Sequence, residues 1–276
     1  MAVTEWSTTV RSDKKFGWLE WRGGLGTRSM TTDPPRATSC LTFHGPLSEG
    51  RAVRLTGELA ARTPATVLDI GCGWGELMLR ILAATPNASG IGMDIDGEDI
   101  RRARDNAAAR GLDGRATFIE GPAKEHLAGA NADLILNVGA YHALGTIPEA
   151  LAEIRERVNP GGRVLFGAEY WERPPTEGEL ANMWPGITAV DCTELATLAD
   201  RTIAAGFGPL RIQTATRGEW EEFESGYALG REEWLLANPG HPQAGEIRAE
   251  LDKTRNIWLR GHRDVFGFAY LTLGVP

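Results

Sequence analysis

The chain has 276 residues, of which 42% are apolar, so it can build one sizeable α/β domain and is not disordered throughout. Its net charge of −8 argues against a protein that grips a phosphate backbone with a basic face, and we expect no nucleic-acid partner. No apolar run approaches the ~18 residues of a membrane helix, so we expect no membrane partner either.

Cysteine usage and the N-terminal composition predict a cytoplasmic protein. Cys40, Cys72 and Cys192 are isolated, with no C-x-x-C pair of a zinc or redox site, and we expect no bound metal. A sparse, odd number of cysteines suits a reducing compartment. Residues 1–16 lack the apolar core of a signal peptide.

The sequence divides into an extension and one domain. Residues 1–40 contain Gly and Pro pairs without helical or strand periodicity, which predicts an irregular extension. The composition changes near Met30, a hypothetical start of translation. A domain of residues 41–276 follows, and a helical pattern over 48–62 opens it with Ser48 as N-cap.

Strands and helices alternate from residue 66 onward, which predicts an α/β fold: a doubly wound, mostly parallel sheet of seven strands with helices on both faces. The expected strands are 66–70, 89–95, 116–120, 132–138, 163–168, 210–214 and 265–273. The expected helices are 76–84, 98–110, 148–158 and 194–205. Two further helical patterns within residues 217–263 form an insertion that we interpret as a helical cap.

A glycine-rich turn follows the first expected strand, where residues 67–75 read VLDIGCGWG. Glycine lets the backbone turn sharply and lets a ligand approach without a Cβ in the way. The helix that begins at Glu76 presents free N–H groups, which suit a ligand bearing a carboxylate. Asp69, two residues before Gly71, supplies an acceptor for an amino group.

The spacing of the glycines decides between two cofactors. A dinucleotide fingerprint, G-x-G-x-x-G, counted from Gly71 needs its third glycine at the position of Glu76, and Gly75 comes one residue early. A pyrophosphate would also be repelled by Asp69. An NAD-type oxidoreductase is therefore an alternative that the spacing disfavours.

The run from Asp69 to Gly75 resembles motif I of class I, Rossmann-like methyltransferases that depend on S-adenosylmethionine, and the similarity spans about residues 66–167. The resemblance implies S-adenosylmethionine as the cofactor. Asp94 ends the second expected strand, where family members accept hydrogen bonds from the ribose hydroxyls, and Ile95 would lie against the adenine. The cofactor-binding residues implied in this way are Asp69, Gly71, Cys72, Gly73, Gly75, Asp94, Ile95, Ala123 and Asn137.

Two positions depart from the family pattern. Many members carry an aspartate after the third strand that binds the adenine amino group, but Pro122 stands there, which leaves the backbone near Ala123 for this role. Asn137 is followed by Val-Gly-Ala rather than Pro-Pro-Tyr, which argues against DNA and protein-glutamine acceptors. Because of Pro122, a non-catalytic S-adenosylmethionine-binding protein is the second alternative.

Catalytic candidates follow the fourth and fifth expected strands, because ligands of a doubly wound sheet lie beyond the carboxyl ends of its strands. His142 is the first candidate for a general base, since its ordinary pKa is about 6.5. Glu169 is the second, because burial raises a carboxyl pKa. Tyr141 would orient the acceptor, and packing is the simpler reading of all three. In related methyltransferases a segment before the first helix covers the cofactor, and the segment with Phe43 and His44 corresponds to it.

The expected reaction is transfer of a methyl group to O, N or C of a small molecule. Trp220, Phe223, Tyr227 and Trp234 recur at helical spacing, which indicates either a buried seam or one wall of a pocket for a flat acceptor. A composition rich in Ala, Gly and Arg but poor in Lys resembles actinobacterial enzymes of secondary metabolism. On that basis a heteroaromatic or indole-like metabolite ranks first among acceptors.

Overall fold

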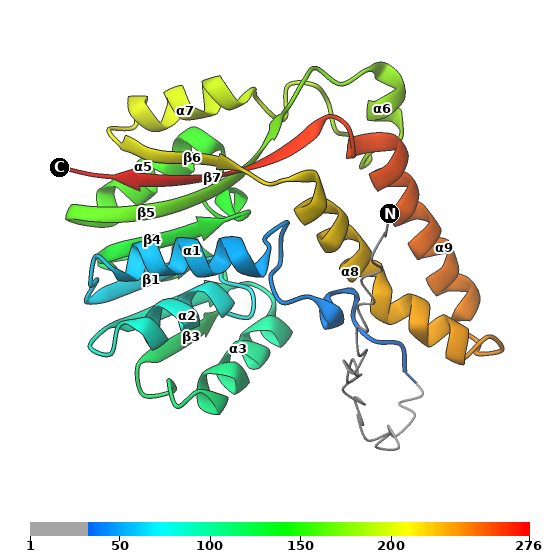
Figure 1. Cartoon of the computed structure of the whole chain (residues 1–276), viewed down its shortest axis with the longest axis horizontal. Coiled ribbons are helices and arrows are strands. Elements are labelled where there is room, and N and C mark those ends of the chain that lie inside the picture. The colour runs from blue at the N-terminus through cyan, green and yellow to red at the C-terminus, as the bar shows by residue number, and fades with distance from the viewer. Residues whose placement is uncertain (1–32) are drawn as a thin grey trace, which may run out of the picture. The chain divides into compact units, whose positions relative to one another are not determined.

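A seven-stranded sheet in the order β3-β2-β1-β4-β5-β7-β6 forms the centre of the computed structural model, which describes residues 33–276 (Figure 1). The strands are β1 Thr66–Ile70, β2 Ser89–Asp94, β3 Ala116–Glu120, β4 Ala132–Val138, β5 Val158–Trp171, β6 Gly208–Thr214 and β7 Phe266–Gly274. Strand β7 lies antiparallel between β5 and β6, and the first five strands pair in parallel. The predicted fold class is confirmed.

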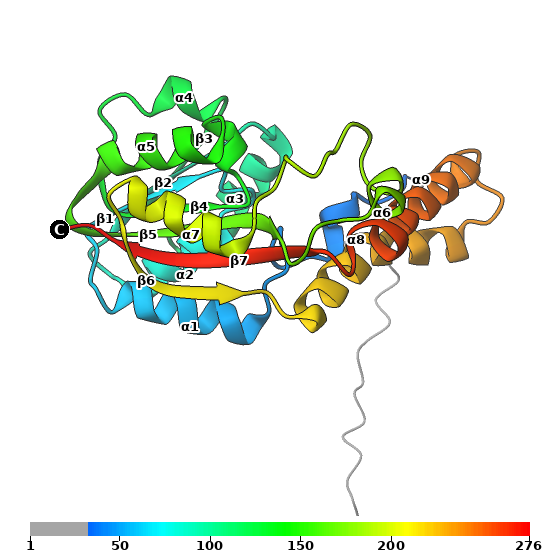
Figure 2. The ribbon, with the colours of Figure 1, turned by 90° about the horizontal axis from the view of Figure 1, so that it is seen from above.

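Helices cover both faces of the sheet (Figure 2). On one face lie α1 Glu49–Ala60, α2 Glu76–Ala84 and α3 Gly97–Ala109. On the other lie α4 Ala123–His126, α5 Ile147–Arg157 and α7 Leu195–Ala204. Strand β4 is apolar on consecutive residues because it is covered on both sides: Leu134, Ile135 and Leu136 are each at most 1% exposed.

Three more helices lie beyond the carboxyl ends of the central strands, namely α6 Glu177–Ala181, α8 Arg217–Ala237 and α9 Ala244–Asn256 (Figures 1 and 2). Helix α8 begins with a capping box in which Thr216 and Glu219 satisfy each other's backbone groups. The Glu219 carboxylate also binds the buried Arg51 guanidinium of α1 through two bonds of 2.8 Å. This ion pair ties the start of α8 to the sheet.

The helix α9 continues into a π-helical turn, Ile257–His262, and then into β7. Strand β5 is longer than predicted at both ends, because Val158 already pairs with Ala132 of β4 and the last residues pair with β7 as far as Phe266. The short helices α4 and α6 were not predicted. Ser48 caps α1 as predicted, since its side chain accepts the Arg51 N–H.

The predicted irregular extension, residues 1–40, falls largely outside the described residues, as does Met30. Its last four residues form a short 3₁₀ helix, η1 Ala37–Cys40. Between residues 33 and 276, no helix is long and apolar enough to cross a membrane.

Candidate functional site

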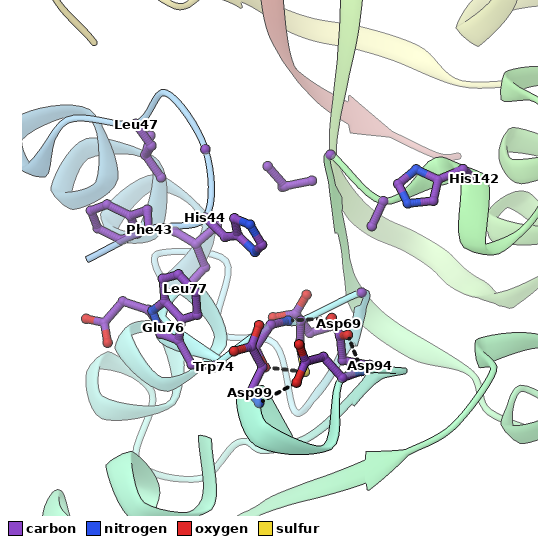
Figure 3. A pocket seen from close by; sticks show the side chains of 18 of the residues that line it. Phe43, His44, Leu47, Asp69, Trp74, Glu76, Leu77, Asp94, Asp99 and His142 are labelled. Atoms are coloured by element: carbon purple, nitrogen blue, oxygen red, sulfur yellow. Dashed lines mark hydrogen bonds between the residues drawn. The ribbon is translucent and has the colours of Figure 1, made fainter. Parts of the chain in front are cut away.

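A cavity of about 410 Å³ opens at the carboxyl ends of β1, β2 and β4, in the size range of small-molecule sites. Figure 3 shows the carboxylates of Asp69, Asp94 and Asp99 gathered at one side and His142 apart from them. The lining residues are Phe43, His44, Gly45, Leu47, Asp69, Gly71, Cys72, Gly73, Trp74, Glu76, Leu77, Asp94, Asp96, Asp99, Val138, Gly139, Ala140, His142 and Tyr270.

The glycine turn between β1 and α2 lies against this cavity. Gly71, Gly73 and Gly75 have φ values of +74°, +51° and +71°, which L side chains rarely adopt. A Cβ on Gly71 would lie 2.2 Å from the Ala140 Cβ, so the loop after β4 packs directly on the turn. At Gly73 the nearest atom lies 3.9 Å from such a Cβ. The turn therefore leaves room beside Gly73 for a ligand to reach the backbone.

The carboxyl group of Asp69 is buried at the end of β1. Burial, and secondarily the charge of Asp94, raise the pKa of Asp69 to about 8. No cation of the described chain pairs with Asp69. A ligand that brings a positive group into the cavity would hold this carboxylate in its charged form. The ammonium group of a methionine moiety is such a group.

The two carboxylate oxygens of Asp94 accept hydrogen bonds from two different loops. Its Oδ2 accepts the Gly73 N–H at 2.8 Å and its Oδ1 accepts the Asp96 N–H at 3.0 Å. Each oxygen keeps a second lone pair for a ribose hydroxyl. The N-cap Asp96 and the buried Asp99 line the same side, and burial, followed by the charge of Asp96, raises the pKa of Asp99.

A segment before α1 forms the opposite wall. The Trp74 indole donates to the Thr42 carbonyl at 2.8 Å, and the His44 ring stacks on it with centroids 5.3 Å apart. On the same indole, the Arg102 guanidinium lies 4.0 Å from the ring centre. The Arg36 guanidinium binds Asp96 at 2.6 Å and Asp99 at 2.9 Å. These contacts hold residues 36–47 over the acidic side of the cavity.

Four residues implied by the family resemblance, Gly75 among them, do not line the cavity. Ile95 is 75% exposed beyond the end of β2. Ala123 is buried at the start of α4. Asn137 is fully buried, where its amide donates to the Ile70 carbonyl at 3.0 Å and its Oδ1 has no partner among the described residues. The role of each in cofactor binding stays a prediction. Gly75 lies at the start of α2, where an added Cβ would come within 2.6 Å of Phe118. The other five line the cavity, namely Asp69, Gly71, Cys72, Gly73 and Asp94.

The three catalytic candidates lie close together, although His142 alone of them lines the cavity. The rings of Tyr141 and His142 contact each other edge to face, with centroids 5.8 Å apart, in the 3₁₀ turn η2 Tyr141–Ala143. Burial raises the pKa of Glu169, and the nearby His142 opposes that rise. Burial, aided by the charge of Glu169, raises the pKa of Tyr141 to about 12. A carboxyl group near an imidazole suits proton transfer.

Several lining residues had no clear signal in the sequence. Asp99 reaches the cavity because α3 begins with Asp96 as its cap, which turns the third residue of the helix toward the glycine turn. Tyr270 comes from the last strand, where its hydroxyl donates to the Pro46 carbonyl at 3.0 Å. Its approach depends on β7 lying next to β5, which the local sequence does not reveal.

Comparisons with known proteins agree with this geometry. A family model described as "Methyltransferase domain" matches residues 67–162. A solved structure of a SAM-dependent methyltransferase from Thiobacillus denitrificans, in complex with S-adenosyl-L-homocysteine, superposes with a TM-score of 0.77 at 25% identity, covering 88% of this chain and 100% of that one. The chain has the class I S-adenosylmethionine-dependent methyltransferase fold and is a methyltransferase.

Two sequence relatives of this methyltransferase differ in what is known of them. The uncharacterized protein YjhP of Escherichia coli is 28% identical and covers 84% of this chain and 93% of its own length. A release factor glutamine methyltransferase of Deinococcus radiodurans is 31% identical over 69% of this chain and 66% of its own. The alternative of an NAD-type oxidoreductase is wrong, because the fold and the matched domain are those of a methyltransferase.

Proposed function

We propose that this methyltransferase transfers the methyl group of S-adenosylmethionine to O, N or C of a small molecule, with a heteroaromatic or indole-like metabolite as the first class to test. The observation that carries the proposal is that one cavity joins the glycine turn and its carboxylates to His142. When bound, the cofactor supplies a methyl group on a positively charged sulfur. The protein must position an acceptor and, for many acceptors, take a proton.

Side chains of the cavity fit the parts of this cofactor. Asp69 would pair with the ammonium group, and the N–H groups of the turn before α2 would bind the carboxylate. Asp94 and Asp99 would accept from the ribose hydroxyls. The wall with His44 would keep water from the reacting atoms.

The acceptor would enter from the side of His142. Its imidazole is placed to take the proton that an O–H or N–H acceptor loses, and Glu169 lies beside it. We interpret α8 and α9 as the cap of this side, so the chain comprises a methyltransferase domain over 41–276 with a helical insertion. The end of β4 and the turn after it read Asn-Val-Gly-Ala, without the Pro-Pro-Tyr that supports a protein-glutamine acceptor.

The first experiment is titration calorimetry, in which S-adenosylhomocysteine and NAD are each titrated into the purified protein and into its Asp94→Ala variant. We expect binding of S-adenosylhomocysteine alone, lost in the variant. A screen of aromatic metabolites with methyl-labelled cofactor then identifies acceptors, and His142→Gln should lower the rate about 10²-fold or more for acceptors that lose a proton. Absence of label transfer to any aromatic compound, despite cofactor binding, would refute the small aromatic acceptor.

A further inference from the structure

The pairing of β5 with β7 places one carboxyl group in a row of aromatic side chains. Glu169 pairs with Phe268, and Trp171 pairs with Phe266. Directly paired residues of antiparallel strands share a face, and so do residues two apart on one strand. Phe266, Phe268 and Tyr270 therefore lie on the face that carries Glu169. We call Tyr270, Phe268, Phe266 and Trp171 the aromatic row.

The aromatic row begins at the cofactor cavity and ends among the rings of the cap. Tyr270 lines the cavity, and its ring lies 4.9 Å from that of Phe268. At the other end, the ring centroid of Phe266 lies 5.2 Å from that of Trp171, 5.6 Å from that of Trp184 and 6.0 Å from that of Trp220 in α8. Glu169 thus stands between the end of the cavity and this group of rings.

The carboxyl of Glu169 has no cationic partner. It is partly exposed, yet within residues 33–276 no other residue donates a hydrogen bond to it and no Arg or Lys pairs with it. The negative charge of Glu169 helps raise the pKa values of the neighbouring Tyr141 and Cys192. Of its surroundings, His142 favours the charged form of Glu169. The arginines at the outer rim are already paired, Arg217 with Asp264 and Arg263 with Glu221 and Asp264.

The charged form of a buried carboxyl group is unfavourable in free energy when no cation pairs with it. Burial raises the pKa of Glu169, so its charged form gains from any cation that enters beside it. Aromatic faces attract cations as well, and the net charge of −8 favours cationic ligands over anionic ones. An anionic acceptor would face Glu169 directly, and a neutral one would leave it unpaired.

We propose that the methyl acceptor is an arylalkylamine, whose ammonium group pairs with Glu169 while its ring packs on Phe266, Trp184 and Trp220, the less buried rings at the outer end of the aromatic row. This rests on the proposed function and narrows its acceptor to an amine nitrogen. In the reaction the ammonium gives one proton to the Glu169 carboxylate, which frees the nitrogen lone pair. That pair forms the bond to the methyl carbon, the methyl–sulfur bond breaks, and its electron pair stays on sulfur as a neutral thioether. The nitrogen carries the positive charge that the sulfur loses.

The test compares three probes with one ring system and different charge: tryptamine, indole and indole-3-acetate. Each is titrated calorimetrically into the protein saturated with S-adenosylhomocysteine. We expect tryptamine to bind about tenfold or more tightly than indole, and indole-3-acetate to bind most weakly. In Glu169→Gln, tryptamine should lose about tenfold or more in affinity while indole changes less than about threefold.

Two variants control the comparison. Glu172→Gln makes the same change at an exposed carboxyl three residues along the chain, and it should leave all three affinities as they are. Glu169→Asp keeps the charge and should keep the preference for tryptamine over indole. Circular dichroism and binding of S-adenosylhomocysteine show whether each variant is folded.

The outcomes separate the two proposals. Loss of S-adenosylhomocysteine binding by the wild-type protein would defeat the proposed function itself. Normal binding of S-adenosylhomocysteine with equal affinities for tryptamine and indole, or with no binding of tryptamine, would overturn the amine acceptor alone. An unchanged preference for tryptamine in Glu169→Gln would overturn the assignment to Glu169.

Discussion

Replacement of Asp69 by Asn should make the protein more stable and its cofactor binding weaker. The buried carboxyl has a pKa of about 8 in the folded state against an ordinary 3.8, so between these pH values the folded chain holds a proton that the unfolded chain has lost. Stability from this group is therefore full below pH 3.8 and declines as the pH rises to about 8. At pH 7 the cost is at most about 4 kcal/mol. An amide at position 69 avoids it at every pH.

The same substitution removes a charged partner from the cofactor's ammonium group, which should weaken binding about 10- to 150-fold. Wild-type affinity should rise with pH up to about 8, because Asp69 must release its proton to pair with a cation, whereas the variant should show no such rise. Urea unfolding at pH 5 to 8 measures the stability. Titration of S-adenosylhomocysteine in two buffers of different ionisation enthalpy measures the proton release.

Asp133→Asn is the matched control. Its carboxylate lies remote from the cavity and accepts from Asn159 and from the backbone of Ala65 and Thr66, which lower its pKa. This variant should lose stability at neutral pH and bind the cofactor normally. A less stable Asp69→Asn protein, or cofactor binding without proton release, would refute the reasoning, because Asp69 would then be charged and structural.

Two other substitutions test the packing around the site. Gly71→Ala would place a Cβ 2.2 Å from the Ala140 Cβ at a φ of +74°. Cofactor binding should be lost, and thermal unfolding should show a loss of stability of about 2 kcal/mol or more. The control Gly111→Ala, at a φ of +65° with no atom near its Cβ, should lose only the stability that the backbone strain costs. Arg51→Met leaves Glu219 buried without its cation and should cost about 3–5 kcal/mol in urea unfolding at pH 7. Because Arg51 and other donors lower the pKa of Glu219 to about 2 despite burial, its contribution is present above pH 4.5 and lost as the pH falls toward 2, and the variant should flatten that decline. An unchanged acid decline would contradict the pairing.

The sequence predicts the glycine turn well because its signals are local. A buried strand, three glycines with left-handed backbone and the start of a helix all lie within residues 66–84, and their bounds match the prediction. Asp69 and Asp94 reach the cavity because they lie at the carboxyl ends of the parallel strands β1 and β2.

The rest depends on contacts between distant segments. Tyr270 faces the cofactor cavity because β7 inserts beside β5, and Arg36 reaches Asp99 across 63 residues of chain. Ile95 is exposed because the strand that was expected to include it ends at Asp94. A local sequence pattern does not show which strands pair or which distant segments come into contact, because both depend on the tertiary structure.

The wall made by residues 36–47 has a consequence for the pace of turnover. It is attached to the rest of the molecule through side chains, such as the Arg36 ion pairs and the Trp74 indole, and belongs to no strand of the sheet. We expect these attachments to break before spent cofactor leaves the acidic side, which would make its release a step separate from the methyl transfer. Added salt weakens the exposed Arg36 pairs and should hasten that departure.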